Sequence, residues 1–393
     1  MTSRLYYDDS YLTTFAAHVT DVAGDGLRIY LDRTAFYPTS GGQPFDTGSL
    51  GGARVVDVVD EGERLAHVLS SPAASLAAGA AVDGAVDWAR RFDHMQQHSG
   101  QHVLSSVFED LFGHTTVSVH FGDDSATVDI DAPSIGVEKI ARAELRANEI
   151  VTGNRPVTVS FVDAASATGL RKPPPRDGTL RVVTIDGIDR SACGGTHVRA
   201  TGEIGAIFLR RVDRVRGTAR IEFVCGARAV RRARADYLAV SEIANALSSS
   251  ADEAPALVTA QAARLRDAES ARKRAEGELA RLEGRALYDA TMPDDDGMRR
   301  AFSRAESGSV EQLRAVAQAF CSRPRALFAA FVARPPLVLV ATSDDSGVDA
   351  GAVLKRALEQ VGGKGGGNAR IAQGTAPGAD RLEEVARAVL ASA

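Results

Sequence analysis

Five residues that can bind a metal ion fall in two short segments of the chain. His94, His98 and His102 recur every four residues in one segment, and Cys193 and His197 are four residues apart in the other. Imidazoles one helical turn apart can hold the same ion, and a thiolate and an imidazole separated by glycines can wrap it from a loop. Because cysteine and histidine suit Zn²⁺, the segments together predict a zinc site joining a helix to a loop.

The residue types do not decide whether such an ion would be structural or catalytic. Zinc proteases with a helical histidine pair place a glutamate after the first histidine as general base, and Ser99 stands there, which disfavours a protease. Four protein ligands would complete a tetrahedral shell, which is typical of a structural ion unless one ligand can leave. Spacing alone therefore does not separate a structural from a catalytic ion.

Composition describes a chain of ordinary globular character. Its 393 residues are 44% hydrophobic and 25% charged, which predicts two or three domains. Three cysteines are too few for a disulfide framework, and Cys225 and Cys321 are expected to be buried. The N-terminus lacks an apolar signal-peptide core, and no apolar run approaches the roughly 20 residues that cross a bilayer. We therefore expect a cytoplasmic location and no membrane contact.

The apolar pattern predicts an α+β fold. Alternating segments with Gly and Asp turns over residues 12–88 predict a small antiparallel β-barrel. A helix from near Arg90 to about Phe112, another over 136–153, and the strands that follow predict a two-layer α/β domain. In this interpretation the helix carries the histidines and the strands deliver the Cys193 loop.

The second half of the chain changes character. Segments 227–247 and 257–290 predict a helical hairpin of coiled-coil type, followed by a linker at 291–297 and a C-terminal α/β domain. We place boundaries near 90, 230 and 297. The predicted parts are a barrel, an α/β domain, a hairpin with its linker and a C-terminal domain, at residues 1–90, 91–229, 230–296 and 297–393.

Positive charge is concentrated in one region of a chain whose net charge is −5. Residues 208–236 hold nine Arg against two Asp and one Glu, a local charge of +6. Such a run is most often a solvated face, although clustered arginines also bind phosphates of nucleic acid. The glycine cluster at 362–367 lacks the Ser or Thr after Lys364 that a P-loop requires, so nucleotide hydrolysis is not expected there.

Six motifs occur in one order along the chain: FYPTSGGQPFDTG (36–48), HSGQH (98–102), GLRKPPP (169–175), CGGTHV (193–198), TGEIG (201–205) and RIEFVCGARA (220–229). In this order they resemble the editing domain of alanyl-tRNA synthetase and its free-standing relatives, the AlaX proteins. The segment GGKGGGNARIAQG (362–374) resembles the DHH-associated domain at the synthetase C-terminus. The resemblance covers nearly the whole chain.

The resemblance implies a long-form AlaX protein, a trans-acting zinc-dependent deacylase that hydrolyses mischarged Ser-tRNA(Ala), with Gly-tRNA(Ala) as a further substrate to test. About 90 residues precede the histidine segment and match the editing barrel, so we expect no aminoacylation activity. Two alternatives stay open: a threonyl-type editing deacylase, and a tRNA-binding protein whose zinc is purely structural. The CGGTH spacing and the C-terminal glycine motif favour the alanyl type.

Roles around the ion follow from the resemblance. The four ligands of one Zn²⁺ per chain are expected to be His98, His102, Cys193 and His197. His94 matches no ligand position and is expected on the helix surface or beside the ligands. Asp189 and Arg171 are expected to support the ligands or to meet a phosphate.

The resemblance also assigns substrate contacts. Gln43 is expected to position water or substrate, and Thr34 to bond the serine hydroxyl, which the cognate alanine lacks. Gly41 and Gly42 either let the backbone approach the substrate or form a turn.

The implied partner is the acceptor end of tRNA(Ala), an unpaired RNA terminus of the kind that proteins read by shape. The residues expected to contact the tRNA are Arg210, Arg211, Arg214, Arg216, Arg231, Arg232 and Lys364. The C-terminal region is the expected surface for a homodimer.

Overall fold

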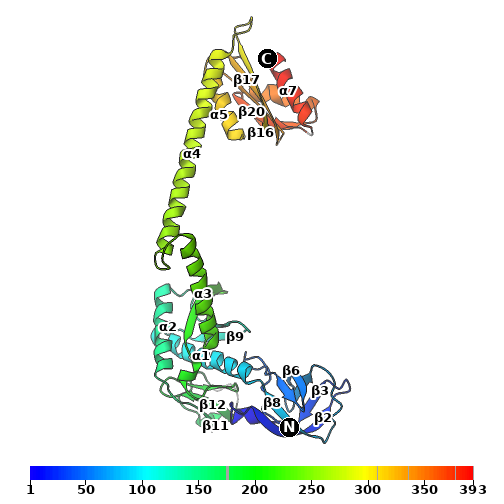
Figure 1. Ribbon diagram of the computed structural model, residues 1–393, viewed down its shortest axis with the longest axis vertical. Helices are drawn as coiled ribbons and strands as arrows, with labels where there is room; N and C mark the ends of the chain where they lie inside the picture. Colours follow the sequence, from blue (N-terminus) through cyan, green and yellow to red (C-terminus); the bar gives the residue numbers. More distant parts are fainter. Residues whose placement is uncertain (174–176, 308, 335, 377, 393) are drawn as a thin grey trace. The chain divides into compact units, whose positions relative to one another are not determined.

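The computed structural model describes residues 1–173, 177–307, 309–334, 336–376 and 378–392. Two compact units make up the chain, Met1–Glu242 and Ile243–Ala393, and the fold is α+β as predicted (Figure 1). Pro174 and Pro175 of the GLRKPPP motif lie outside the described residues. Within the described ranges, no helix combines the length and apolar character that crossing a bilayer requires.

The N-terminal residues form the predicted barrel, which is closed and has six strands in the order β2-β3-β7-β6-β5-β8. Every neighbouring pair is antiparallel. Along β2, Phe15, Ala17 and Val19 are buried and the residues between them are exposed, which is the two-residue period of a half-buried strand. The barrel strands are β2 (Thr14–Val22), β3 (Arg28–Leu31), β5 (Gly48–Leu50), β6 (Ala53–Asp60), β7 (Leu65–Leu69) and β8 (Ala81–Val86). Two short strands, β1 (Ser3–Arg4) and β4 (Arg33–Thr34), pair in parallel, and the 3-10 turn η1 (Leu5–Tyr7) follows β1 directly.

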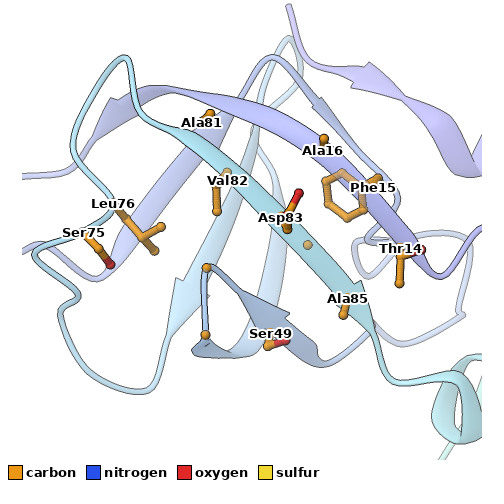
Figure 2. A pocket seen from close by; sticks show the side chains of 13 residues that line it. Thr14, Phe15, Ala16, Ser49, Ser75, Leu76, Ala81, Val82, Asp83 and Ala85 are labelled. Atoms are coloured by element: carbon orange, nitrogen blue, oxygen red, sulfur yellow. The ribbon is translucent and has the colours of Figure 1, made fainter.

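A cavity of about 920 Å³ lies against β2 and β8 of the barrel (Figure 2). Phe15 sits in its wall above Gly84, where a Cβ atom would come within 2.4 Å of the Phe15 ring. Asp83 is the one charged residue in a lining made mainly of small side chains. One carboxylate does not make a metal site, and the group of metal-binding side chains found among the described residues lies elsewhere.

The histidine segment lies in α1 (Trp88–Phe112), close to the predicted bounds. The helix begins at Asp87, whose carboxylate accepts a hydrogen bond from the Arg90 amide, and it ends at Gly113 in the left-handed conformation. Nearly every residue from His94 to Phe108 is buried. A helix surrounded by protein on all sides can hold its side chains in fixed positions.

Two antiparallel sheets and one helix complete the first unit around α1. The helix α2 (Val137–Thr152) stops at Gly153, as predicted. One sheet has the order β14-β15-β10-β9 and the other the order β11-β12-β13. The strands are β9 (Thr116–Phe121), β10 (Ala126–Ile130), β11 (Val157–Asp163), β12 (Thr179–Ile185), β13 (Asp189–Ala192), β14 (Ile207–Val215) and β15 (Thr218–Cys225), with 3-10 turns η2 (Ala164–Ser166) and η3 (Thr201–Ile204) between some of them.

Close packing between α1 and β15 explains why residue 100 is a glycine and why Cys225 is buried. A Cβ atom on Gly100 would lie 2.3 Å from Cys225 Sγ, so the helix can approach the strand because residue 100 has no side chain. Cys225 and Cys321 are both buried, which confirms the prediction that they serve as small apolar residues.

Two helices follow at the predicted places, α3 (Ala227–Ala246) and α4 (Ala254–Ala290). The α4 helix packs against α5 (Val310–Cys321), where a Cβ atom on Gly284 would lie 2.4 Å from the Val316 carbonyl oxygen. Four apolar residues of its predicted coiled-coil seam are exposed, namely Val258, Leu265, Leu279 and Leu282.

The C-terminal residues form a five-stranded sheet in the order β16-β17-β18-β20-β19, in which β16 and β17 are parallel and the other neighbours antiparallel. The glycine cluster is the edge strand β19, and Lys364 is exposed on it. Besides α5, the elements are β16 (Arg299–Ser307), β17 (Ala326–Arg334), β18 (Leu337–Thr342), α6 (Ala350–Gln360), β19 (Lys364–Gly367), β20 (Ile371–Thr375) and α7 (Ala379–Ser392). The division into domains at 90, 230 and 297 stays a prediction beside the observed two units.

Candidate metal centre

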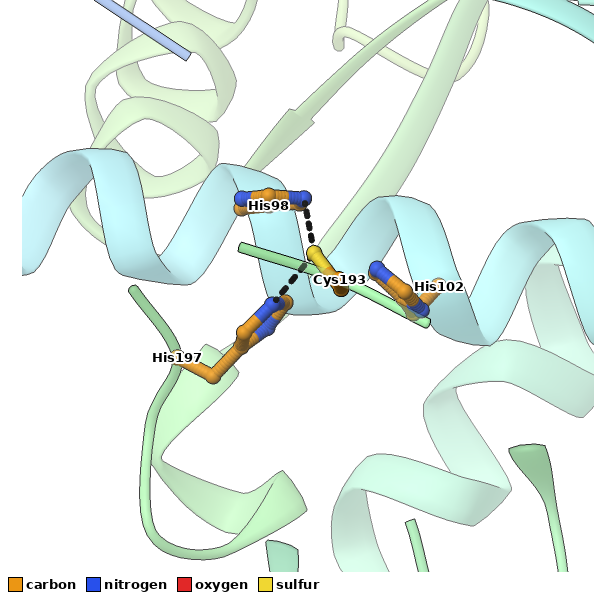
Figure 3. Close-up of side chains that lie close together, drawn as sticks. All are labelled: His98, His102, Cys193 and His197. Carbon is orange, nitrogen blue, oxygen red and sulfur yellow. Dashed lines mark hydrogen bonds between the residues drawn. The ribbon is translucent and has the colours of Figure 1, made fainter. Parts of the chain in front are cut away.

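The structure brings the four predicted ligands together (Figure 3). His98 and His102 extend from α1, whereas Cys193 and His197 come from the loop after β13. Their ligand atoms all lie within 4.8 Å of one another. Cys193 Sγ is 3.4 Å from His98 Nε2 and 3.3 Å from His197 Nε2. The three histidines are buried and the residue Cys193 is half-buried.

Each imidazole is held through its Nδ1 atom. His98 Nδ1 lies 2.8 Å from Gln43 Oε1, His102 Nδ1 lies 2.7 Å from an oxygen of Asp189, and His197 Nδ1 lies 3.1 Å from Ser99 Oγ. Partners on the outer nitrogen fix the ring orientation and leave Nε2 for a metal. Thus three separate contacts leave Nε2 of each of the three rings available to a metal.

A two-glycine turn delivers Gln43 to His98. Ser40 and Gln43 exchange backbone hydrogen bonds across Gly41 and Gly42, whose φ angles are 57° and 86°. Two consecutive positive φ angles are typical of the tightest hairpin turns and favour glycine. The Gln43 side chain is fully buried, with its amide nitrogen donating to Thr196 Oγ1 at 2.7 Å and its oxygen also accepting from the Thr196 amide. The glycines therefore form a turn, the second of their two predicted roles.

Asp189 and Arg171 support His102. Arg171 Nε donates to the second oxygen of Asp189 at 2.7 Å, and Ser191 Oγ lies 3.0 Å from the same carboxylate. Burial alone would lower the pKa of His102, but the hydrogen bonds to Asp189 and Cys193 raise it to about 9. Burial opposes ionisation of Asp189 as well, yet the hydrogen bond from His102 and the charge of Arg171 lower its pKa to about 2. The carboxylate therefore stays ionised as an acceptor for the imidazole.

The thiol of Cys193 is poised as a thiolate. Burial alone would raise its pKa, but the neighbouring His98 and His197 rings hold that pKa well below its usual value of 9. Burial, followed by repulsion from His98, lowers the pKa of His197 to about 3. A thiolate beside a neutral imidazole is the protonation state in which both groups bind metals.

The loop that carries Cys193 is fixed by one arginine. Arg181 Nη1 donates to the carbonyl oxygens of Cys193 and Gly195, at 2.7 and 2.9 Å, and its Nε donates to the Tyr7 carbonyl at 2.9 Å. Gly195 passes directly under His98, since a Cβ atom there would lie 2.1 Å from His98 Cε1. The loop can approach α1 this closely only with glycine at that position.

The donor set fits Zn²⁺. In a tetrahedral site with Zn–S near 2.3 Å and Zn–N near 2.0 Å, neighbouring sulfur and nitrogen ligands lie about 3.5 Å apart. The two sulfur–nitrogen distances of 3.4 and 3.3 Å are close to that value. One thiolate, three imidazoles and a hydrogen-bonded outer shell form a set that zinc prefers.

Thr34 lies in the barrel core and not among the clustered ligands. Its hydroxyl donates to His67 Nε2 at 2.8 Å, because His67 Nδ1–H is used on the Ile29 carbonyl at 3.0 Å. The same oxygen accepts from the Phe36 amide at 3.1 Å, which leaves one acceptor position on Oγ1. Its bonding to a serine hydroxyl stays a prediction.

The His67–Thr34 pair makes the barrel sensitive to acid. Burial lowers the pKa of His67 to about 4, against 6.5 in the unfolded chain. Between these values only the unfolded state binds the proton, so stability is full above pH 6.5 and falls as pH drops to 4, by on the order of 3 kcal/mol. We expect urea unfolding of metal-free protein to show this loss, and His67→Gln to reduce its slope by the share of one proton, because the buried His94 and His197, whose pKa values are also lowered, contribute the rest. Replacing the exposed His18 by Gln should leave the slope unchanged, and a wild-type slope in His67→Gln would contradict the assignment.

His94 is not a surface residue, as one of its two predicted placements had it. The structure buries His94, and burial together with Arg90 and Arg228 lowers its pKa to about 4. Neither of its ring nitrogens has a hydrogen-bond partner among the described residues.

The predicted tRNA-contacting arginines are all exposed, on β14, the following turn and α3. Arg210 pairs with Glu222, Arg211 with Asp213 and Arg232 with Asp236. Within the described residues, no ion pair engages the remaining three, Arg214, Arg216 and Arg231.

Sequence analysis missed three residues that build the centre. For Ser99 the sequence showed only that the glutamate of zinc proteases is absent. No role was predicted for Thr196, which lies within CGGTH, or for Arg181. Thr196 and Ser99 sit inside the metal motifs, so their polar side chains beside ligands were an available signal. Arg181 carried none, because its contacts depend on how β12 lies beside the loop.

Comparison with known proteins agrees with this architecture. The profile of the threonyl and alanyl tRNA synthetase second additional domain matches residues 180–222, and the DHHA1 domain profile matches residues 301–392. A profile of class II (A) tRNA synthetases matches residues 7–90, the region of the barrel. The C-Ala domain of Aquifex aeolicus alanyl-tRNA synthetase matches 25% of the chain at 20% identity with a TM-score of 0.22, too low to support a conclusion about the fold.

Relatives of two lengths match nearly the whole chain. Alanine–tRNA ligases of Methanoregula boonei and Korarchaeum cryptofilum are 32% and 34% identical to it over 97% and 98% of its length. The chain spans only 42% and 44% of those ligases. The alanyl-tRNA editing protein AlaX-L of Pyrococcus horikoshii is 30% identical over 95% of this chain and 94% of its own length. The chain therefore belongs to the AlaX-type alanyl-tRNA editing proteins.

Proposed function

We propose that the protein hydrolyses the ester bond of mischarged Ser-tRNA(Ala), and of Gly-tRNA(Ala), in trans with one Zn²⁺ per chain. The observation that carries the proposal is the cluster of His98, His102, Cys193 and His197, in which Cys193 is half-buried. The match to AlaX-L over 94% of that relative supplies the reaction class.

The four clustered residues would hold the ion, and their partners would fix their geometry. When bound, Zn²⁺ would act as a Lewis acid that polarises the ester. Gln43 acts through His98, because its side chain is fully buried and committed to His98 and Thr196. Asp189 orients His102 in the same way. The half-buried Cys193 marks the side from which the ester end of the tRNA enters.

We assign contacts with the tRNA body to cations that have no ion-pair partner among the described residues. Arg214, Arg216 and Arg231 are exposed and free to meet phosphates, which would give salt-dependent affinity. The exposed seam residues of α4, such as Leu265 and Leu279, are the surface on which a homodimer would form.

The proposal is tested by deacylation of Ser-tRNA(Ala), Gly-tRNA(Ala) and Ala-tRNA(Ala) by zinc-loaded protein, with and without a chelator. We expect the seryl ester to be lost at least ~100-fold faster than the alanyl ester, and metal removal to abolish turnover. Alanine, ATP and uncharged tRNA(Ala) should yield no product. Intact Ser-tRNA(Ala) after incubation with zinc-loaded protein would refute the proposal.

Two alternatives have their own outcomes in the same assay. Faster loss of Ser-tRNA(Thr) than of Ser-tRNA(Ala) would indicate threonyl-type editing. Stoichiometric zinc and tRNA binding without turnover would indicate a binding protein with a structural ion. Cys193→Ser separates the last case, since loss of a structural ion takes folding of the first unit with it.

A further inference from the structure

A second cavity, of about 590 Å³, lies between the start of α1 and the start of α3. Arg90, Phe92 and Asp93 of α1 contribute to its lining, as do Arg228 and Arg231 of α3. Its volume is in the range of ligand pockets. None of the four clustered metal ligands is part of this lining, so the cavity is separate from the metal centre.

The three arginines of this cavity differ in how they are held. Arg228 is buried and donates to both carboxylate oxygens of Asp93. Arg90 Nη1 lies 3.6 Å from a carboxylate oxygen of Asp123, whose side chain is 84% exposed. Arg231 is exposed, and no ion pair or hydrogen bond engages its guanidinium within the part of the chain that the structure describes. Arg231 can therefore bind an anion in the cavity without first giving up another partner.

The floor of the cavity lies in a positive electrostatic potential. His94 is part of the lining and only 2% exposed. Burial is the main cause that lowers its pKa to about 4, and repulsion from Arg90 and Arg228 follows, ahead of the opposing attraction of Asp93 and Asp123. The arginines thus outweigh the two aspartates at this point, which favours an anion as ligand. Both ring nitrogens of His94 are buried, so the imidazole is not itself a contact for the ligand.

The start of α3 adds to this potential. Ala227, the first residue of the helix, is part of the cavity lining, and the first turn contains no acidic residue. The amide end of a helix carries a partial positive charge and favours anions. The helix end and the arginines therefore act in the same direction.

We propose that this cavity binds a phosphate group of the tRNA backbone, with the Arg231 guanidinium donating to its oxygens and Arg90 and the start of α3 stabilising its charge. The site rests on the proposed function, because that function supplies the RNA. His94 precedes the metal ligand His98 by four residues on the same face of α1, which is about 6 Å along the helix axis. An RNA strand whose ester end occupies the metal centre can therefore reach the cavity with a backbone phosphate.

The test measures binding of uncharged tRNA(Ala) to the full zinc-loaded chain by fluorescence anisotropy, over a series of salt concentrations. Arg231→Gln should raise the dissociation constant by about 5- to 10-fold near 0.1 M salt and reduce the salt slope by about 0.7 to 0.9. Arg234 is the matched control, since it is exposed on the same helix and is not part of the cavity lining. Arg234→Gln removes the same charge and should change the dissociation constant by less than ~2-fold.

Asp123 gives a second pair of variants with the opposite sign. Asp123→Asn removes a carboxylate from the cavity and releases Arg90, so tRNA affinity should rise by roughly 3-fold. The neighbouring Asp124 is also exposed but is not part of the lining. Asp124→Asn adds the same net charge and should leave the affinity within ~1.5-fold of wild type.

Inorganic phosphate is the probe for a free anion as ligand. Calorimetry should show no binding of inorganic phosphate tighter than about 1 mM, because one small anion lacks the other contacts of the tRNA. Tighter phosphate binding that is lost in Arg231→Gln, with tRNA affinity unchanged, would overturn the proposal in favour of a free anion. Equal effects of Arg231→Gln and Arg234→Gln on tRNA binding would overturn it as well. If Ser-tRNA(Ala) stays intact but the variants bind tRNA as expected, the proposed function fails and the phosphate site stands.

Discussion

Replacing Gly195 by alanine is expected to weaken zinc binding strongly, while the neighbouring replacement at Gly194 leaves it intact. An added Cβ atom at residue 195 would lie 2.1 Å from His98 Cε1 and 2.4 Å from its Nδ1. The ring cannot retreat, because α1 is buried around it and Gln43 holds its Nδ1 at 2.8 Å. The loop cannot retreat either, since Arg181 holds the Gly195 carbonyl. One of the four ligands would therefore be pushed out of place.

We expect zinc affinity of Gly195→Ala to fall by about 100-fold or more, since even loss of an outer-shell contact weakens metal sites 10- to 100-fold. Competition with a chromophoric chelator measures it, and Ser-tRNA(Ala) hydrolysis should fall in parallel. At residue 194 the added Cβ would meet only Tyr7, at 3.6 Å, an ordinary contact. Gly194→Ala should thus bind zinc within ~3-fold of wild type. Wild-type zinc affinity in Gly195→Ala would show that the loop is not held as described.

The same pair of glycines shows how far the sequence leads. Spacing and residue type were enough to predict that Cys193 and His197 lie close to the histidines of α1, because ligand chemistry is local. Gly195, and not Gly194, is indispensable because it is the glycine that passes under His98, a residue 97 positions earlier. Periodicity contains no information on such an approach.

Gln43 illustrates the same limit from the other direction. The resemblance placed it near the reacting ester, which stays a prediction, and in the structure its side chain contacts His98 and Thr196. The sequence did contain the device that makes this possible, the two glycines before it, although their role as a turn was one of two alternatives. Local signals thus predicted the bounds of α1 and the region of the barrel, whereas contacts between the barrel and α1 required the structure.

The largest loss of stability is expected from Arg91→Met, at the junction of the barrel and α1. Arg91 and Asp46 are both fully buried, and the guanidinium donates to both carboxylate oxygens and to the carbonyls of Ser10 and Ala35. Removing one member of a buried ion pair leaves an uncompensated charge and costs about 3–5 kcal/mol. Urea unfolding followed by circular dichroism should show a loss of that size in the free energy of unfolding.

The size of this loss depends on how exposed the ion pair is to solvent. An exposed arginine–aspartate pair in the barrel therefore serves as a control. Arg64 and Asp21 form an ion pair at 3.2 Å, but their side chains are 49% and 57% exposed. Arg64→Met should cost less than about 1 kcal/mol, because water replaces the lost partner. In Arg91→Met no water can do so, and adding Asp46→Leu should recover part of the stability by removing the stranded carboxylate. Two results would contradict a role of the charge: equal losses of unfolding free energy in Arg91→Met and Arg64→Met, or a double variant that is less stable than Arg91→Met. Either would mean that Arg91 stabilises the junction through its packing and its carbonyl contacts.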